Sequence, residues 1–128
     1  MAKRILISKE DNRVLQFQDT DLFNYSDPRP DMEIVDENGK VIGVIPGHEV
    51  IEISEDDWNA LVDVDEVDDE VQGMKIKRYV IKPKMDIKER KIILDKTTGA
   101  IYEELENDKK ELLFELKEFK LKTDVKNT

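Results

Sequence analysis

The sequence predicts an α+β domain, with a mainly antiparallel sheet built from hairpins and two helices. Three pairs of short β-rich runs flank turn-forming residues, at 5–17, 33–45 and 92–102. A capping residue followed by apolar residues at helical spacing predicts a short helix near 54–63. The same spacing predicts an amphipathic helix near 107–122.

Composition limits the size of the domain and the kinds of ligand it can bind. We expect residues 1–122 to form one small domain and 123–128 to be a frayed tail, since the chain has 128 residues. Charged residues make up 41% of it, against an average of about 25%, and the net charge is −10. This charge disfavours direct binding to nucleic acid or to an anionic membrane. The absence of cysteine excludes disulfides, thiolate zinc sites and cysteine nucleophiles.

The first hairpin pairs Arg4–Ser8 with Arg13–Phe17 across the polar turn Lys9–Asn12. Because side chains alternate along a strand, we expect Leu15 and Phe17 to share the buried face.

The second hairpin has the clearest turn signal in the chain. Asn38 and Gly39 separate two apolar runs, and both residue types tolerate positive φ, which a two-residue hairpin turn needs. Pro46 and Gly47 end its second strand, and residues 49–53 predict another strand.

Ser54 marks the start of the short helix. It is a good N-cap, and Asp57 lies in the capping-box position, where Glu is more usual. Trp58, Leu61 and Val62 then form one apolar stripe. Trp58 is a candidate anchor for a partner, although a lone tryptophan on such a stripe is more often part of the core.

Residues 63–73 predict an acidic loop. Counted from Asp63 or from Asp65, the sixth position is Asp68 or Glu70 instead of the glycine that an EF-hand needs, so the EF-hand pattern fails in both registers, while weak divalent-cation binding stays open. The acidic residues that we take as interaction candidates are Asp63, Asp65, Glu66, Asp68, Asp69 and Glu70.

The sign of the charge reverses after this loop. Residues 41–74 carry a net charge of −11, whereas residues 75–96 carry +6. A strand at 75–82, stopped by Pro83, brings three basic interaction candidates, Lys75, Lys77 and Arg78. We expect the two segments to neutralise each other, either within one subunit or between subunits, and so to set register and orientation.

The predicted C-terminal helix places Leu112, Leu116 and Phe119 on one apolar face, and these are further interaction candidates. Residues 100–106 fit either a strand of the third hairpin or the start of this helix.

Catalytic and cofactor motifs are not apparent in the sequence. His48 is the only histidine, and the glycines do not match a phosphate-binding loop or a dinucleotide-binding fingerprint. We therefore expect no enzymatic activity, no cofactor and no metal.

The stretch 32–63 resembles small tail and fibre-module proteins of tailed bacteriophages. The shared order is a strand, a hairpin with Asp-Glu-Asn-Gly, Pro-Gly, a strand, and Ile-Ser-x-x-x-Trp opening a short helix; the strand at 4–8 also fits. The resemblance covers roughly the first half of the chain. It implies a virion component or assembly chaperone, multimeric and without an active site.

Two functions from different classes follow from these observations. The first is a structural or assembly protein, acting through protein–protein contacts as a homo-oligomer or in a larger complex. The second is an acidic inhibitor that imitates DNA and binds a basic partner; the basic segment 75–96 makes it the weaker choice. We find no signal peptide or membrane span, and so expect the protein in the virion or the host cytoplasm.

Overall fold

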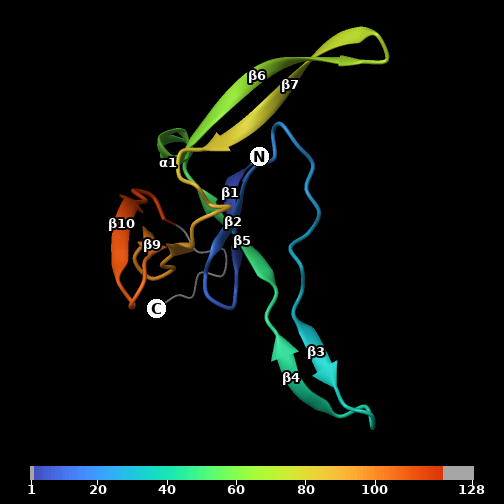
Figure 1. Cartoon of the computed structure of the whole chain (residues 1–128), viewed down its shortest axis with the longest axis vertical. Helices are drawn as coiled ribbons and strands as arrows, with labels where there is room; N and C mark the ends of the chain where they lie inside the picture. The colour runs from blue at the N-terminus through green and yellow to red at the C-terminus, as the bar shows by residue number, and fades with distance from the viewer. Residues whose placement is uncertain (1, 120–128) are drawn as a thin grey trace.

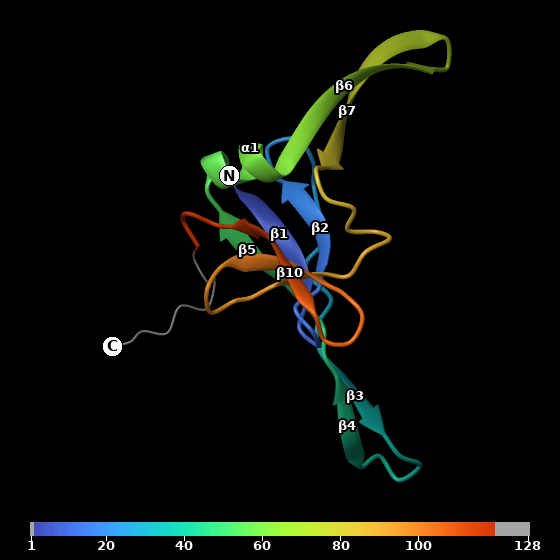
Figure 2. The same ribbon diagram turned by 60° about the vertical axis from the view of Figure 1, so that its left-hand side comes forward.

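A small β-rich body carries two hairpins that project from it in opposite directions (Figure 1; Figure 2). The structure is a computed structural model, and it describes residues 2–119. In that range the body contains two three-stranded antiparallel sheets and one short helix. The mainly antiparallel hairpin architecture predicted from the sequence is thus confirmed, whereas the second helix is not.

The first sheet has the strand order β2-β1-β5. Its strands are β1 (Lys3–Ser8), β2 (Val14–Asp19) and β5 (His48–Ile53). The predicted first hairpin is confirmed, but its register shifts between Leu6 and Ile7. At this bulge Val14 and Phe17 both lie in the buried core, whereas Leu15 is only half-buried, so the expectation that Leu15 is buried together with Phe17 is not met.

The second sheet has the order β10-β9-β8 and confirms the predicted third hairpin. Its strands are β8 (Ile92–Leu94), β9 (Ala100–Glu104) and β10 (Lys110–Glu115). Of the two alternatives for residues 100–106, strand or start of a helix, the strand is therefore correct for residues 100–104.

The amphipathic helix predicted at 107–122 is wrong over residues 107–119. Asn107 and Asp108 have positive φ of 62° and 61°, a turn conformation that starts β10 instead of a helix. β10 then pairs antiparallel with β9, with Lys110 opposite Glu104. Pairing with a neighbouring strand thus overrides the helical spacing of the apolar residues. Residues 120–122 and the predicted tail 123–128 lie outside the described residues.

The predicted short helix is α1 (Glu55–Leu61), a little shorter than the predicted 54–63. Ser54 caps it as expected, accepting a hydrogen bond from the backbone N–H of Asp57 at 3.1 Å. Val62 is already extended, with φ −138° and ψ 137°, because the next strand begins there.

The acidic loop predicted at 63–73 is also wrong, since most of it is a strand. β6 (Val62–Val71) pairs along its whole length with β7 (Met74–Pro83). Gln72 and Gly73, both with positive φ (52° and 80°), connect them in a tight turn. A strand forms here because the basic residues of β7 lie across from the acidic residues of β6.

The Asn-Gly hairpin is confirmed as β3 (Met32–Val35) and β4 (Val41–Ile45). Gly39 has φ of 81° in its turn. Among residues 2–119, β3 and β4 pair only with each other, so this hairpin is separate from the two sheets of the body.

The core lies between the two sheets and α1. Trp58 is 1% exposed and meets Phe17 edge to face, with ring centroids 6.2 Å apart. The Asp57 carboxylate is equally buried and accepts hydrogen bonds from the backbone N–H groups of Lys117 and Glu118, at 3.0 and 3.1 Å. Asp57 therefore ties the segment after β10 to the helix instead of completing a capping box.

Candidate interaction surface

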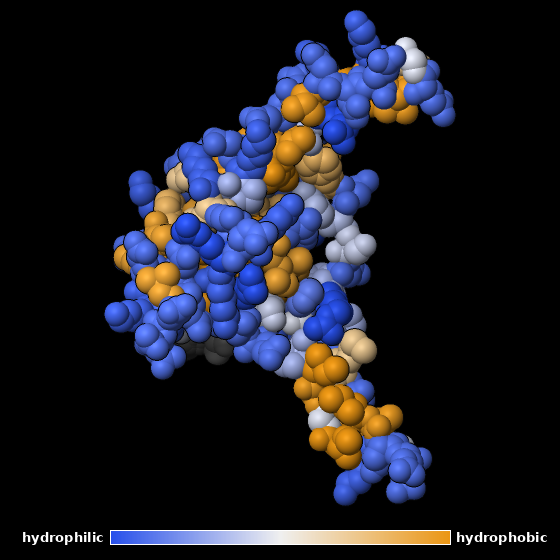
Figure 3. Space-filling model, in the orientation of Figure 1, coloured by the Kyte–Doolittle hydropathy of each residue, from blue (hydrophilic) through white to orange (hydrophobic). Residues whose placement is uncertain are grey.

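The β3–β4 hairpin, called here the apolar arm (residues 32–45), presents apolar side chains that the described part of the chain leaves exposed. Its large apolar side chains are between 41 and 63% exposed: Met32, Ile34, Val35, Val41, Ile42, Val44 and Ile45. Figure 3 shows them as an almost continuous hydrophobic surface along the arm, in contrast to the mainly hydrophilic body. The end of the arm is polar, from Asp36 to Lys40.

Such an arm has little means of stabilising itself. A two-stranded hairpin alone is marginally stable in water, because it has no third strand or helix against which to bury a face. Contiguous exposed apolar surface in a soluble protein usually marks a site of interaction with another molecule. The apolar arm is therefore the strongest candidate for an interaction surface.

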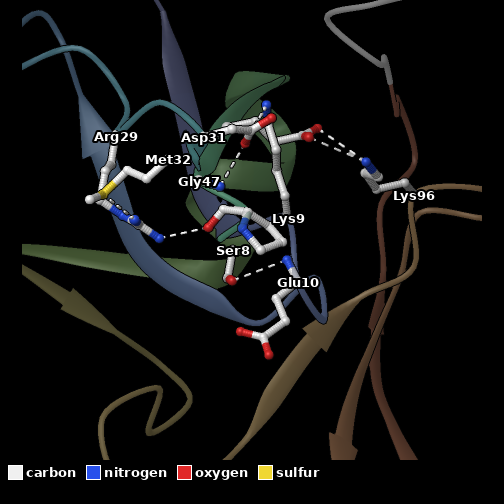
Figure 4. Close-up of polar contacts among 10 residues, drawn as sticks. Ser8, Lys9, Glu10, Arg29, Asp31, Met32, Gly47 and Lys96 are labelled. Atoms are coloured by element: carbon white, nitrogen blue, oxygen red, sulfur yellow. Dashed lines mark hydrogen bonds and ion pairs between the residues drawn. The ribbon is translucent and has the colours of Figure 1, made fainter. Parts of the chain in front are cut away.

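The base of the arm is held to the body by hydrogen bonds to backbone groups, and Figure 4 shows those made by the side chains of Arg29 and Asp31. The N–H of Gly47 donates to Oδ1 of Asp31 at 2.7 Å, and its carbonyl accepts from the N–H of Lys9 at 2.9 Å. Nη2 of Arg29 donates to the carbonyl of Pro46 at 2.6 Å, and the Arg29 carbonyl accepts from the N–H of His48. These contacts fix the direction in which the arm leaves the body.

Gly47 is required at this position for steric reasons. A Cβ atom there would overlap the carbonyl oxygen of Arg29 and the backbone of Pro30. Only glycine lets the incoming and outgoing chains of the arm approach so closely.

Asp31 has an altered pKa at the same place. The hydrogen bond from the N–H of Gly47 is the main cause that lowers its pKa below the usual 3.8, and partial desolvation opposes it. Lys9, whose Nζ lies 3.4 Å from the same oxygen, lowers the pKa further. The contact is thus strongest when Asp31 is ionised.

The β6–β7 hairpin, called here the charged arm (residues 62–83), brings together the acidic and basic candidates. Within the described residues its ion pairs are Glu66–Lys77 at 3.2 Å, Asp69–Arg78 at 2.8 Å and Asp65–Lys82 at 2.6 Å, and Asp63 lies 3.9 Å from Lys84. In the strand register, Asp68 lies across from Lys77 and Glu70 across from Lys75. These ion pairs neutralise charge within one subunit.

One lysine of this arm shows the effect in its pKa. A hydrogen bond to Asp65 is the main cause that raises the pKa of Lys82 above 10.5, with attraction to the same carboxylate adding to it. Both side chains are largely exposed, so the pair contributes little to global stability.

The remaining candidates do not form one surface. Trp58 and Leu116 are buried in the core, at 1% and 7% exposure. Leu112 is 49% exposed on β10. Phe119 is half-buried and packs against Gly99, where an added Cβ would lie 2.9 Å from the Cβ of Phe119. The predicted helical face of Leu112, Leu116 and Phe119 therefore does not exist.

An open apolar groove of about 960 Å³ lies where the base of the charged arm meets the first sheet. Aromatic and aliphatic side chains dominate its walls: Leu15, Phe23, Tyr25, Tyr79, Met85 and Ile87. Phe23 and Tyr79 are 37% and 47% exposed, so the groove presents aromatic surface to solvent.

Within residues 2–119 there is no group of three or more histidine, aspartate or glutamate side chains placed to hold a metal ion. Nor does that part of the chain contain a helix with the length and apolar character needed to span a membrane. Comparisons with protein-family models, with curated proteins and with solved structures found no match to this chain.

Sequence reasoning missed the residues of the apolar arm as interaction candidates. The signal was present in the sequence, since both strands contain adjacent apolar residues, such as Ile34-Val35 and Val44-Ile45. A strand with one solvent-exposed face would instead alternate apolar and polar residues. This pattern indicates a strand pair that is apolar on both faces. The sequence could not show that the other described residues leave those faces uncovered.

Proposed function

We propose that this chain is a non-enzymatic structural or assembly protein that acts through protein–protein contacts, with the apolar arm as its principal contact surface. The observation that carries the proposal is the half-exposed state of seven large apolar side chains on one projecting hairpin of the described structure. Such a surface fits a protein that completes its burial against a partner.

The free energy available from burying the arm is comparable with the cost of association. Full burial of a Val, Ile or Met side chain contributes about 1.5–3 kcal/mol. Covering most of the arm would therefore offset much of the association cost, which is of order 4–15 kcal/mol. The contacts at the base of the arm add to this effect, because an arm held in one direction loses less entropy on binding.

The ion pairs of the charged arm favour an interface formed by apolar contacts over one formed by charged contacts. Its carboxylates Asp65, Glu66 and Asp69 are engaged by basic residues of the same hairpin, so they are less available to a partner. The same pairing weakens the alternative of an acidic inhibitor that imitates DNA. Such an inhibitor needs a surface of uncompensated negative charge, and the charged arm mixes both signs.

As part of the same proposal, we place the protein in a bacteriophage virion, in a tail, collar or fibre, or in the host cytoplasm before assembly. The support is the resemblance of residues 32–63 to tail and fibre-module proteins, together with a projecting apolar hairpin that suits assembly. Partners are therefore further copies of the chain or other virion proteins.

The test is the mass of the protein in solution, measured by sedimentation at about 0.1 M and about 1 M salt, where the Debye length falls from about 10 to about 3 Å. We expect the protein to be associated at both salt concentrations, since the contact is mainly apolar. An oligomer that dissociates at high salt would move the interface to the charged arm. A monomer at both would contradict self-assembly and favour a foreign partner.

A further inference from the structure

We propose that the apolar arm of one copy of this chain occupies the apolar groove of a second copy, so that copies join head to tail. This inference rests on the proposed function and names the partner as the chain itself. It also names the receiving surface, which is the groove between the first sheet and the base of the charged arm.

The groove has the chemistry to receive an apolar hairpin. Phe23 and Tyr79 offer exposed aromatic faces, and Met85 and Ile87 add aliphatic surface from the loop after β7. Aromatic residues and methionine are typical of interface cores, and methionine adapts its shape to a partner. The groove is open to solvent, so a partner can reach these side chains.

The arm of the same copy does not fill this groove. The apolar arm projects from the end of the body opposite to the charged arm, in both views (Figure 1; Figure 2). The groove lies at the base of the charged arm and includes Tyr79, Val80 and Ile81 of β7. The high exposure of Ile42 and Val44, at 63% and 54%, shows directly that residues 2–119 of the same chain do not cover the arm. A second copy is then the occupant that supplies both surfaces.

Charge favours the same arrangement. The apolar arm carries Glu33, Asp36 and Glu37 against one basic residue, Lys40, for a net charge of −2. The part of the following loop that lines the groove carries Lys84 and Lys88 against Asp86, for a net charge of +1. These opposite charges orient an incoming arm toward the groove, although the apolar contact supplies most of the affinity.

This contact joins two different surfaces, and so has a consequence for symmetry. Each copy keeps one arm and one groove available after its first contact. Copies therefore continue into a ring or an open chain instead of stopping at a dimer. Pairing of two apolar arms with each other would instead give closed, two-fold dimers.

Two complementary variants of the full chain test the proposal. Ile42→Thr/Val44→Thr alters the arm and keeps its β-branched character, and Phe23→Ser/Tyr79→Thr alters the exposed aromatic residues of the groove. We expect each variant alone to associate at least tenfold more weakly than wild type. An equimolar mixture should restore one contact, because one variant supplies the groove and the other the arm. The expected product is a one-to-one dimer, measured by sedimentation.

Other outcomes would overturn the inference in distinguishable ways. If the groove variant alone assembles like wild type, the arms pair with each other. If wild type assembles and the mixture gives no dimer, the arm does not bind the groove, yet the proposed function stands. If wild type is monomeric, self-assembly itself fails. Fluorescence of the buried Trp58 verifies that each variant folds, and Leu112→Thr, at an exposed site outside both surfaces, is the matched control.

Discussion

The carboxylate of Asp31 accepts a hydrogen bond from the backbone N–H of Gly47 at 2.7 Å, and this contact joins the two chain segments at the base of the apolar arm. Fifteen residues of sequence lie between these two positions, including both strands of the arm. The direction of the arm is therefore controlled by a few atoms close to the body.

Gly47→Ala should disrupt this base. The added Cβ overlaps backbone atoms of Arg29 and Pro30, which move less easily than a side chain. We expect a loss of about 1–3 kcal/mol in the free energy of unfolding, the usual cost of overpacking, measured by urea denaturation.

Gly43→Ala is the matched control for that substitution. Gly43 lies in β4 of the same arm, and a Cβ there would be in ordinary contact with Ile34, at 3.6 Å. We expect no loss of stability from it. Equal losses in the two variants would contradict the steric account of Gly47.

The contact between Asp31 and Gly47 should weaken in acid. The pKa of Asp31 is lower in the folded protein than its usual 3.8. Its stabilising contribution is therefore complete above 3.8 and is lost as the pH falls through the folded pKa. The amide resonance of Gly47, followed by NMR, should shift with a midpoint below 3.8 and should lose this transition in Asp31→Asn. A midpoint at or above 3.8 would refute the assignment.

The ion pair between Asp65 and Lys82 should be visible locally but not globally. The pKa of Lys82 is raised above 10.5, so its contribution is present below 10.5 and is lost as the pH rises through the folded pKa. Asp65→Asn should lower the pKa of Lys82 toward 10.5, as measured by NMR. The denaturation midpoint should stay unchanged, because both groups are exposed. A large drop in that midpoint would show that the charged arm is more important to the fold than its exposure indicates.

Asp57→Ala should be strongly destabilising. The buried carboxylate satisfies two backbone N–H groups, of Lys117 and Glu118, and hydrogen bonds to a charged group contribute about 1.5–3 kcal/mol each. We expect a loss of about 3 kcal/mol, measured by urea unfolding with Trp58 fluorescence. Asp56→Ala removes an exposed charge from the same helical turn and is the control. Similar losses in both would point to the helix dipole instead of the buried hydrogen bonds.

The parts of the fold that depend on local chemistry could be predicted from the sequence. Asn38-Gly39 specified its hairpin, and Ser54 specified the start of α1, because each acts on neighbouring backbone groups. The strand after Asn107 could not be predicted in this way. The spacing of Leu112 and Leu116 fits a helix, and only the presence of β9 beside them favours a strand.

The conformation of the acidic segment and the exposure of the candidate site also depend on contacts with distant parts of the chain, and so could not be predicted from local sequence. Asp63 to Glu70 has the composition of a solvated loop, and its strand conformation depends on the basic residues that lie across from it in β7. The exposure of Ile42 and Val44 depends on where the rest of the chain folds. Sequence predicted that these residues form a hairpin, but not that the hairpin projects from the body.

The most direct test of the proposed function compares the solution mass of wild type, Ile42→Thr/Val44→Thr and Leu112→Thr at one protein concentration, at about 0.1 M and about 1 M salt. We predict that wild type and Leu112→Thr form the same oligomer at both salt concentrations, while the arm variant is a folded monomer. Retention of the wild-type mass by the arm variant, or a monomeric wild type, would contradict assembly through the apolar arm.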